Sequence, residues 1–237
     1  MKFSSREFKK TFQMVNDLPS SLVSVFVVSV VCMNLLANKS IELNISWLAL
    51  DAGMILSWLS FLIMDIIIKK YGGEKSIRLS FFSVIINLFV TFFFFIASII
   101  PGVWAEAFSS VNNLENINVA LNNTISNNLF IVFGSTMAFL ISAIIDTIIN
   151  ELLGKKFNKD NFTHFAVRSY VSTMFSQFCD NLIFSLIVSM TFFGWSFLQC
   201  ITCALTGGLI ELFCEIIFSP LGYKFWVKNK NESEEVL

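Results

Sequence analysis

Charged residues are scarce in this chain. Aspartate, glutamate, lysine and arginine make up 14% of its 237 residues, compared with about 25% in an average soluble domain. Histidine occurs once, at His164, and no HExxH, GxSxG or phosphate-binding-loop sequence is present. Such motifs supply the metal ligands, nucleophiles and phosphate contacts of many enzymes. The sequence therefore predicts that the chain is not an enzyme and carries no cofactor.

Cysteine is also sparse, with five residues at Cys32, Cys179, Cys200, Cys203 and Cys214. All five lie in apolar segments, and an odd number there favours reduced, packed thiols over a disulfide framework. Cys200 and Cys203 have the spacing of metal ligands, but neither a second pair nor a nearby histidine completes a site, so we expect no bound metal. No basic patch with interleaved aromatic residues occurs, and we expect no nucleic acid partner.

Hydrophobic residues are correspondingly abundant. They make up 55% of the chain, 28 residues are phenylalanine, and the mean hydropathy is +0.73. Several apolar runs approach the length of about 20 residues that a membrane-spanning helix needs. The sequence predicts an all-α, polytopic integral membrane protein embedded in a lipid bilayer. Its six transmembrane helices are expected at 18–38, 47–69, 77–100, 127–151, 166–192 and 196–222.

The remaining segments complete the expected organisation. Residues 1–17 form a cytoplasmic N-terminal segment, 18–225 a six-helix transmembrane domain and 226–237 a cytoplasmic tail. The Asn-rich segment 103–125 contains no lysine or arginine and is expected to be an external loop. The first apolar run lacks a small-residue cleavage site, so we expect a retained helix rather than a signal peptide.

Basic residues predict the orientation of these helices. With both termini in the cytoplasm, every lysine and arginine except Lys39 falls on the cytoplasmic side, as the positive-inside rule requires. These residues are Lys2, Arg6, Lys9, Lys10, Lys69, Lys70, Lys75, Arg78, Lys155, Lys156, Lys159, Arg168, Lys224, Lys228 and Lys230.

The fifth expected helix carries a polar face. Thr173, Gln177, Asp180, Asn181 and Phe184 recur at steps of three and four residues, so they share one side of the helix. A lone charge such as Asp180 near mid-membrane costs about 3 kcal/mol or more. This face must line the bundle interior or a water-filled cavity. It indicates a binding site, although hydrogen bonds that only hold helices together use the same residue types.

Two helical hairpins resemble each other. Asp65 in the second expected helix and Asp146 in the fourth are each followed by a short basic loop and an arginine, Arg78 or Arg168, that opens the next helix. The pattern is that of a parallel repeat of helices two–three and four–five, as in some transporters; chance similarity of apolar hairpins is the alternative. The repeat would place both aspartates at similar depth, either at an inner gate or in ion pairs that order the inner loops.

The sixth expected helix contains two acids. Glu211 and Glu215 lie one turn apart on one face, with Gly207 on the same side. Two carboxylates so placed in lipid repel each other unless one takes up a proton or a cation pairs with them. Alternatively, one glutamate reaches the cytoplasmic surface and the other bonds a neighbouring helix. Asn34 in the first helix and Asp51 near the outer end of the second are further polar groups, either in the site or at the interface.

Three motifs resemble those of a known family. They are D-x6-G from Asp65 to Gly72, RSxxSTxxSQxxDN from Arg168 with Phe184 following, and ExxxSPLGY from Glu215. Together they resemble the YhhQ-type vitamin uptake transporter (VUT) family, the queuosine-precursor transporters, over roughly residues 18–225. The helix-five motif is the most specific of the three.

The resemblance implies import of 7-deazaguanine precursors of queuosine across a bacterial inner membrane by a secondary carrier. The candidate cargoes are 7-cyano-7-deazaguanine, 7-aminomethyl-7-deazaguanine and queuine. A membrane subunit that binds substrate for an ATPase-driven energy-coupling factor importer is the alternative. Many family members carry a lysine around the position of Glu211, and the glutamate in this chain would favour the cationic aminomethyl compound. A monomer and a homodimer both remain open.

Ligand chemistry assigns roles to the residues. A deazaguanine offers N1–H and a 2-amino group as donors and O6 as an acceptor, so a carboxylate and an amide can read its edge. We expect Asp180 to read that edge, Phe184 or Trp195 to stack on the ring, and the helix-six acids to hold an amine or a coupling proton. The expected substrate-binding residues are Asp180, Gln177, Asn181, Phe184, Glu211, Glu215 and Asn34. The expected gate or ion-pair residues are Asp65, Asp146, Arg168 and Arg78.

Overall fold

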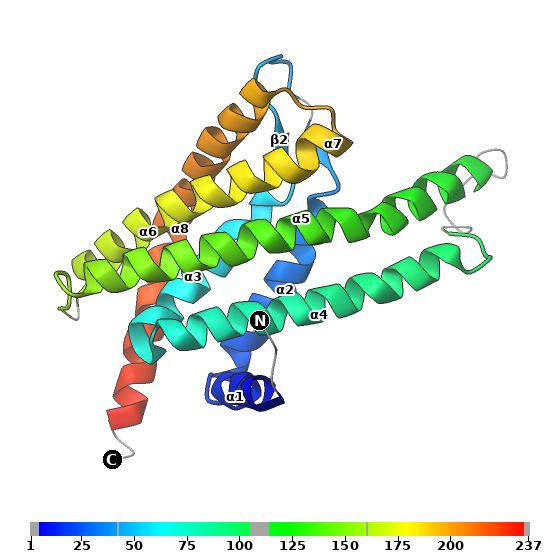
Figure 1. Ribbon diagram of the computed structural model, residues 1–237. Coiled ribbons are helices and arrows are strands. Elements are labelled where there is room, and N and C mark those ends of the chain that lie inside the picture. The colour runs from blue at the N-terminus through cyan, green and yellow to red at the C-terminus, as the bar shows by residue number, and fades with distance from the viewer. Residues whose placement is uncertain (1–4, 42, 105–113, 160, 235–237) are drawn as a thin grey trace.

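The computed structural model describes residues 5–41, 43–104, 114–159 and 161–234. Residues 1–4 of the expected N-terminal segment, 105–113 of the expected Asn-rich loop and 235–237 of the tail lie outside this description. Most described residues are helical, which confirms the all-α class (Figure 1). The helices are α1 (Ser5–Asn16), α2 (Ser20–Leu36), α3 (Met54–Tyr71), α4 (Gly73–Ile99), α5 (Leu114–Gly154), α6 (Phe162–Phe184), a π-helical segment (Ser185–Ser189), α7 (Met190–Phe192) and α8 (Phe197–Glu234).

Each of the six expected helical segments contains a long helix, but the start of the second is wrong. Residues 47–53 are not helical: strand β2 (Leu50–Asp51) pairs antiparallel with β1 (Ser40–Ile41), and α3 begins only at Met54. The Asp51 side chain explains this boundary, because its Oδ1 accepts a 2.8 Å hydrogen bond from the Gly53 backbone N–H. Such short aspartate-to-backbone bonds favour turns over helices.

The start of the fourth expected helix is also wrong. Helix α5 begins at Leu114 rather than near 127, so part of the Asn-rich segment is helical. Two of its asparagines bind Trp104, which follows α4: Asn122 Oδ1 accepts from the indole N–H at 2.6 Å, and Asn118 Oδ1 accepts from the backbone N–H. These tertiary hydrogen bonds explain how residues with modest helix propensity stay helical.

Helix α8 extends further than expected. It passes through Pro220 and continues to Glu234, whereas its end was expected near residue 222. Proline removes one backbone donor but does not prevent packing on either side. Gly222 lies tightly against α3, since a Cβ there would come within 3.2 Å of Leu62 Cδ1 and Ile66 Cδ1. This close approach holds the helix in place beyond the proline.

Four helical segments among the described residues are long and apolar enough to cross a membrane by length and composition: α4, residues 117–154 of α5, the α6–α7 segment and residues 197–224 of α8. The α1–α2 pair, bent by 116°, adds a fifth if it is counted as one span. Helix α2 alone has 17 residues, and α3 carries Asp65, Lys69 and Lys70. The expected total of six spans therefore stays a prediction.

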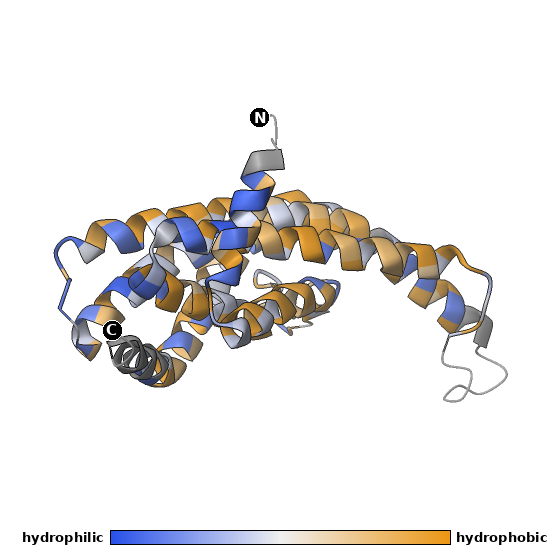
Figure 2. Cartoon of the chain, turned by 90° about the horizontal axis from the view of Figure 1, so that it is seen from below, coloured by the Kyte–Doolittle hydropathy of each residue, from blue (hydrophilic) through white to orange (hydrophobic). Residues whose placement is uncertain are grey.

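Apolar surface of the helices faces outward, as a bilayer-embedded protein requires. Phe89 exposes 61% of its side chain, Phe133 60% and Phe213 62%. Figure 2 shows hydrophobic residues along most of each long helix, whereas hydrophilic residues gather on α1 and at the connections. Because lipid tails solvate such side chains, this exposure is favourable in a membrane and costly in water.

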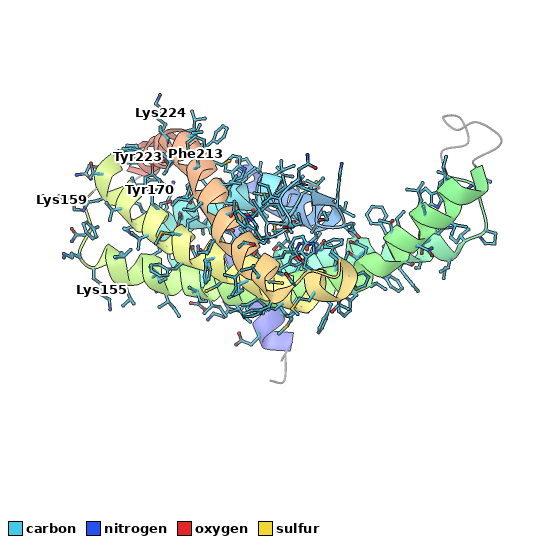
Figure 3. The ribbon with its side chains drawn as sticks, turned by 90° about the horizontal axis from the view of Figure 1, so that it is seen from above. Lys155, Lys159, Tyr170, Phe213, Tyr223 and Lys224 are labelled. Atoms are coloured by element: carbon cyan, nitrogen blue, oxygen red, sulfur yellow. The ribbon has the colours of Figure 1, made fainter. Side chains whose placement is uncertain are left out.

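The connections α3–α4 and α5–α6 lie at one end of the bundle, together with α1. On α4, Arg78 pairs with Glu7 at 3.2 Å and Lys75 pairs with Asp17 at 3.1 Å. The Gly73 N–H donates a 3.0 Å hydrogen bond to Glu151 Oε1 on α5. Figure 3 shows Lys155, Lys159 and Lys224 at the same end. We call this the basic end; the β1–β2 hairpin and the start of α8 lie at the opposite end (Figure 1).

Candidate functional site

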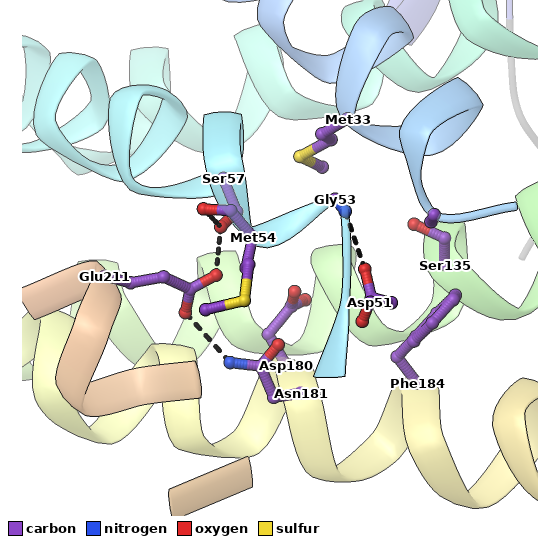
Figure 4. A pocket seen from close by; sticks show the side chains of 11 residues that line it. Met33, Asp51, Gly53, Met54, Ser57, Ser135, Asp180, Asn181, Phe184 and Glu211 are labelled. Atoms are coloured by element: carbon purple, nitrogen blue, oxygen red, sulfur yellow. Dashed lines mark hydrogen bonds between the residues drawn. The ribbon is translucent and has the colours of Figure 1, made fainter. Parts of the chain in front are cut away.

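A cavity lies between the β1–β2 hairpin and the middle of the bundle (Figure 4). Its empty volume is about 330 Å³ including the open mouth. We call it the acidic pocket, because three of its lining residues are acids. The lining residues are Met33, Ala37, Asp51, Gly53, Met54, Ser57, Ser135, Asp180, Asn181, Phe184 and Glu211.

Glu211 is fixed from two neighbouring helices. Asn181 Nδ2 on α6 donates to Glu211 Oε2 at 2.8 Å, and the Ser57 hydroxyl on α3 donates to Oε1. The Glu211 side chain is fully buried. Two donors leave each carboxylate oxygen with unused acceptor capacity, so Glu211 can accept further hydrogen bonds from a ligand.

Asp180 and Asp51 bring two more carboxyl groups to the pocket. Asp180 Oδ1 accepts a 2.9 Å hydrogen bond from Ser142 on α5, and Asp51 Oδ1 accepts from the Gly53 N–H. The ring of Phe184, 6% exposed, forms an apolar wall. No lysine, arginine or histidine occurs among the described lining residues. The arrangement suits a ligand that combines a flat apolar face, hydrogen-bond donors and a positive charge.

The structure brings four of the seven expected substrate-binding residues into this pocket: Asp180, Asn181, Phe184 and Glu211. Gln177 is fully buried but does not line the pocket, and neither its Nε2 nor its Oε1 has a hydrogen-bond partner. Asn34 donates to the Val30 carbonyl of its own helix at 2.8 Å and also lies outside the lining. Glu215, one turn from Glu211, belongs to a second group of side chains.

This second group surrounds Asp65 on α3, nearer the basic end. Asn150 Nδ2 donates to Asp65 Oδ1 at 2.5 Å, and the hydroxyls of Ser172 and Thr173 approach the carboxyl at 3.3 and 3.4 Å. The Ser169 hydroxyl contacts both Asp65 and Glu215. Asp65 and Glu215 are therefore joined through one hydroxyl, and we call them the carboxyl pair.

Asp146 is a neighbour of the carboxyl pair. Its Oδ1 accepts from Ser176 at 3.2 Å, and its carboxyl group interacts electrostatically with Asp65 and Glu215. Asp65 and Asp146 thus lie in one buried region. The repeat, which would set them at similar depth, stays a prediction.

The two arginines of the expected gate behave differently from each other. Arg168 donates twice to Asn150 Oδ1, at 3.0 and 2.7 Å, so it reaches Asp65 through Asn150 rather than directly. Arg78 instead binds Glu74 and Glu7, and donates to Thr11 on α1 at 3.0 Å. Arg78 thus forms ion pairs with acids of α1 and of its own helix rather than with Asp65, and a role for either arginine in a gate stays a prediction.

Several members of the two groups were not identified from sequence. Asp51 was expected near the end of a helix, either in the site or at the interface, yet it lines the pocket from strand β2. Asn150 lies one helical turn beyond Asp146, a spacing that could have marked it as part of the same face. The π-helical segment directly after Phe184 has no sequence signal; such segments often occur at functional sites.

Comparison with known proteins gives one match. The profile of a family described as "Putative vitamin uptake transporter" matches residues 51–225. No curated protein and no solved structure matches the chain. The matched range begins at Asp51 and includes both the acidic pocket residues of α3, α5, α6 and α8 and the carboxyl pair.

Proposed function

The chain belongs to the vitamin uptake transporter family, and from this we propose that it imports 7-deazaguanine precursors of queuosine across the bacterial inner membrane as a secondary carrier. The family and the apolar helices support a multi-pass membrane transporter. The cargo and the transport mode are inferred from the resemblance of the motifs and from the chemistry of the acidic pocket.

The acidic pocket supports a flat ligand with a donor-rich edge. A deazaguanine offers N1–H and its 2-amino group side by side, and a carboxylate can accept from both. We assign this role to Asp180. Its Oδ1 accepts a hydrogen bond from Ser142, whereas its Oδ2 accepts none from the described residues. The Asn181 amide can reorient to serve O6, and Phe184 offers a ring on which the ligand can stack.

One observation carries the proposal further: three acids and no basic residue line the pocket among the described residues. A cationic ligand offsets the repulsion between these carboxylates, whereas a neutral ligand does not. Among the deazaguanines, the aminomethyl compound bears such a charge and the nitrile does not. We therefore expect the aminomethyl compound to be preferred, with Glu211 and Asp51 around its ammonium group.

The arrangement of the basic residues supports both termini in the cytoplasm. The basic end contains α1, the α3–α4 and α5–α6 connections and Lys224. The positive-inside rule would place this end in the cytoplasm, with the hairpin side of the acidic pocket facing outward. Substrate would then enter near the hairpin and leave past the carboxyl pair.

The test is restoration of tRNA queuosine in a bacterial host that lacks both precursor synthesis and its own carrier. Wild type should restore queuosine when 7-aminomethyl-7-deazaguanine is supplied, and Asp180→Asn should not, because an amide cannot accept both edge donors. Asp17→Asn is the matched control, since Asp17 is an exposed partner of Lys75 far from the pocket. If wild type restores nothing, the cargo assignment fails. If Asp180→Asn restores queuosine fully, Asp180 is not the edge reader.

The ATPase-dependent alternative has its own test. Purified protein in liposomes without any other protein should move labelled substrate if it is a secondary carrier. Binding without transport under an imposed ion gradient would favour a binding subunit of an energy-coupling factor importer.

A further inference from the structure

Ser169 joins two acids that belong to different helices. Its hydroxyl contacts Oδ2 of Asp65 on α3 and Oε1 of Glu215 on α8. A hydroxyl has one hydrogen and can donate it to only one acceptor. The second contact is a hydrogen bond only if the other carboxyl group carries a proton and donates it to the Ser169 oxygen. The arrangement therefore accommodates one extra proton, shared by the two carboxyl groups and bound in addition to the serine's own hydrogen.

The two carboxyl groups also interact with each other. Asp65 and Glu215 are close enough for their charges to interact, and neither carboxylate has a donor to offer the other when both are deprotonated. Both side chains are almost completely buried, at 1% and 0% exposure. Two adjacent negative charges at this depth would repel each other with little screening by water.

Gln177 gives an independent indication of an unmet hydrogen-bonding requirement beside the pair. It is fully buried, and neither atom of its amide group has a partner. It lies on α6 one turn from Thr173, which approaches Asp65, and one turn from Asn181, which binds Glu211. Its side chain thus faces the region between the carboxyl pair and the acidic pocket. An unpaired buried amide is unfavourable, so a transient partner such as water or substrate is expected there.

The carboxyl pair adjoins a small cavity toward the basic end. Asp65, Lys69, Asn150, Phe165, Arg168 and Ser169 line this cavity. Its cations face the pair from two helices: Lys69 on α3 lies 5.4 Å from the centre of the Phe165 ring, and Arg168 on α6 reaches Asp65 through Asn150. On α5, Asp146 faces the pair, and its Oδ2 has no hydrogen-bond partner. In the proposed orientation this cavity would lie on the cytoplasmic side of the pair.

We propose that Asp65, Ser169 and Glu215 form a proton-binding site that couples substrate import to proton import. The proposal rests on the function proposed above and adds the driving ion. The step is a proton transfer without change of oxidation state: a carboxylate oxygen of the pair takes a proton from a hydronium ion on the outer side, which becomes water. The carboxyl O–H bond later breaks as the proton passes to water on the cytoplasmic side.

The helices that hold the proton site also hold the substrate pocket, which supplies the coupling. Helix α6 carries Ser169 and Asn181, and α8 carries Glu215 and Glu211. A shift of α6 against α8 would therefore alter both contacts together. Protonation of the pair removes a buried charge and favours the arrangement in which α3, α6 and α8 stay closed around it, so proton and substrate binding bias the same helix contact.

Transport by purified protein in liposomes tests the coupling. Two assays use labelled 7-aminomethyl-7-deazaguanine: exchange against internal unlabelled substrate, and accumulation driven by an imposed inward proton gradient. In Asp65→Asn and Glu215→Gln, accumulation should fall about tenfold more than exchange, because exchange needs no net proton movement. Glu211→Gln should reduce both assays together, and Asp17→Asn should resemble wild type. Equal reduction of both assays in the pair variants, or wild-type accumulation that follows a sodium gradient instead, would overturn the proposal.

Infrared spectroscopy tests the proton site without any substrate. Protein reconstituted in lipid at neutral pH should show a protonated-carboxyl C=O band, and part of it should be missing in the double variant Asp65→Asn/Glu215→Gln. An unchanged band in the double variant would refute the proton site even if transport is normal. Conversely, a lost band together with no transport of the label by wild type would leave the proton site standing and reject the cargo.

Discussion

Asn181 on α6 and Glu211 on α8 are joined by a 2.8 Å hydrogen bond at the floor of the acidic pocket. This bond links the amide that was expected to help read the ligand edge to the acid whose charge was expected to favour a cationic ligand. A lysine at the same position would repel a cationic ligand, whereas Glu211 attracts one. Under the proposed function, the identity of this single residue would therefore bear directly on which deazaguanine the pocket accepts.

The first prediction concerns this charge. Glu211→Gln should weaken uptake of 7-aminomethyl-7-deazaguanine about tenfold, equivalent to about 1.4 kcal/mol, because one attractive charge is removed from the ammonium group. Uptake of the neutral 7-cyano compound should change much less, since it bears no such group. Competition of each compound against the labelled amine measures the ratio. Equal losses for both compounds would show that Glu211 has only a structural role.

The second prediction uses two adjacent glycines on α8. A Cβ at Gly207 would lie 3.1 Å from Asn181 Nδ2, whereas a Cβ at Gly208 would lie no closer than 3.5 Å to Phe178. Gly207→Ala should therefore displace Asn181 and raise KM for uptake, and Gly208→Ala is the matched control. The same kinetic effect in both variants would mean that helix packing, rather than the position of Asn181, controls substrate binding.

The third prediction concerns the turn between α3 and α4. Gly72 has φ of 86°, and nothing lies within 4 Å of a Cβ added there. Gly72→Ala should thus destabilise the protein by about 1–2 kcal/mol through backbone strain alone, seen as a lower midpoint of thermal unfolding in detergent. Gly102 also has open space but no positive φ, so Gly102→Ala should leave the midpoint almost unchanged. Similar midpoints for the two variants would contradict the left-handed turn.

The fourth prediction concerns orientation. In a background whose five cysteines are replaced, Ser196→Cys at the start of α8 should react with a membrane-impermeant thiol reagent added to intact cells. Lys159→Cys at the basic end should react only after the membrane is opened. Both side chains are exposed, so accessibility of the thiol itself is matched. The reverse labelling pattern would place the basic end outside and reject the proposed orientation.

Helical periodicity explains how much of the site could be predicted from sequence. Steps of three and four residues identified one face of α6, and three members of that face, Asp180, Asn181 and Phe184, line the acidic pocket. The same reasoning placed Gln177 in the site, but its buried side chain does not line the pocket. A periodic pattern assigns residues to a side of a helix, whereas the depth of a cavity along that side depends on what packs opposite.

Partners that come from other elements could not be predicted in this way. Asp51 lines the pocket because a short hairpin follows α2, and Ser57 reaches Glu211 because α3 and α8 pack closely. Arg78 pairs with Glu7 because α1, bent by 116° from α2, lies beside the start of α4. In each case, the local sequence contains no information about which element lies across the interface.

The sequence by itself determined the class of this protein, the approximate position of its long helices and the polar face of α6, because hydropathy and helical period are local properties. Only the tertiary structure decided that its buried acids divide into two groups. Glu211 and Glu215 lie one turn apart on one helix, yet Ser57 and Asn181 draw the first into the acidic pocket, while Ser169 ties the second to Asp65. The rotation and register of packed helices set that division, and these depend on contacts between residues far apart in the chain.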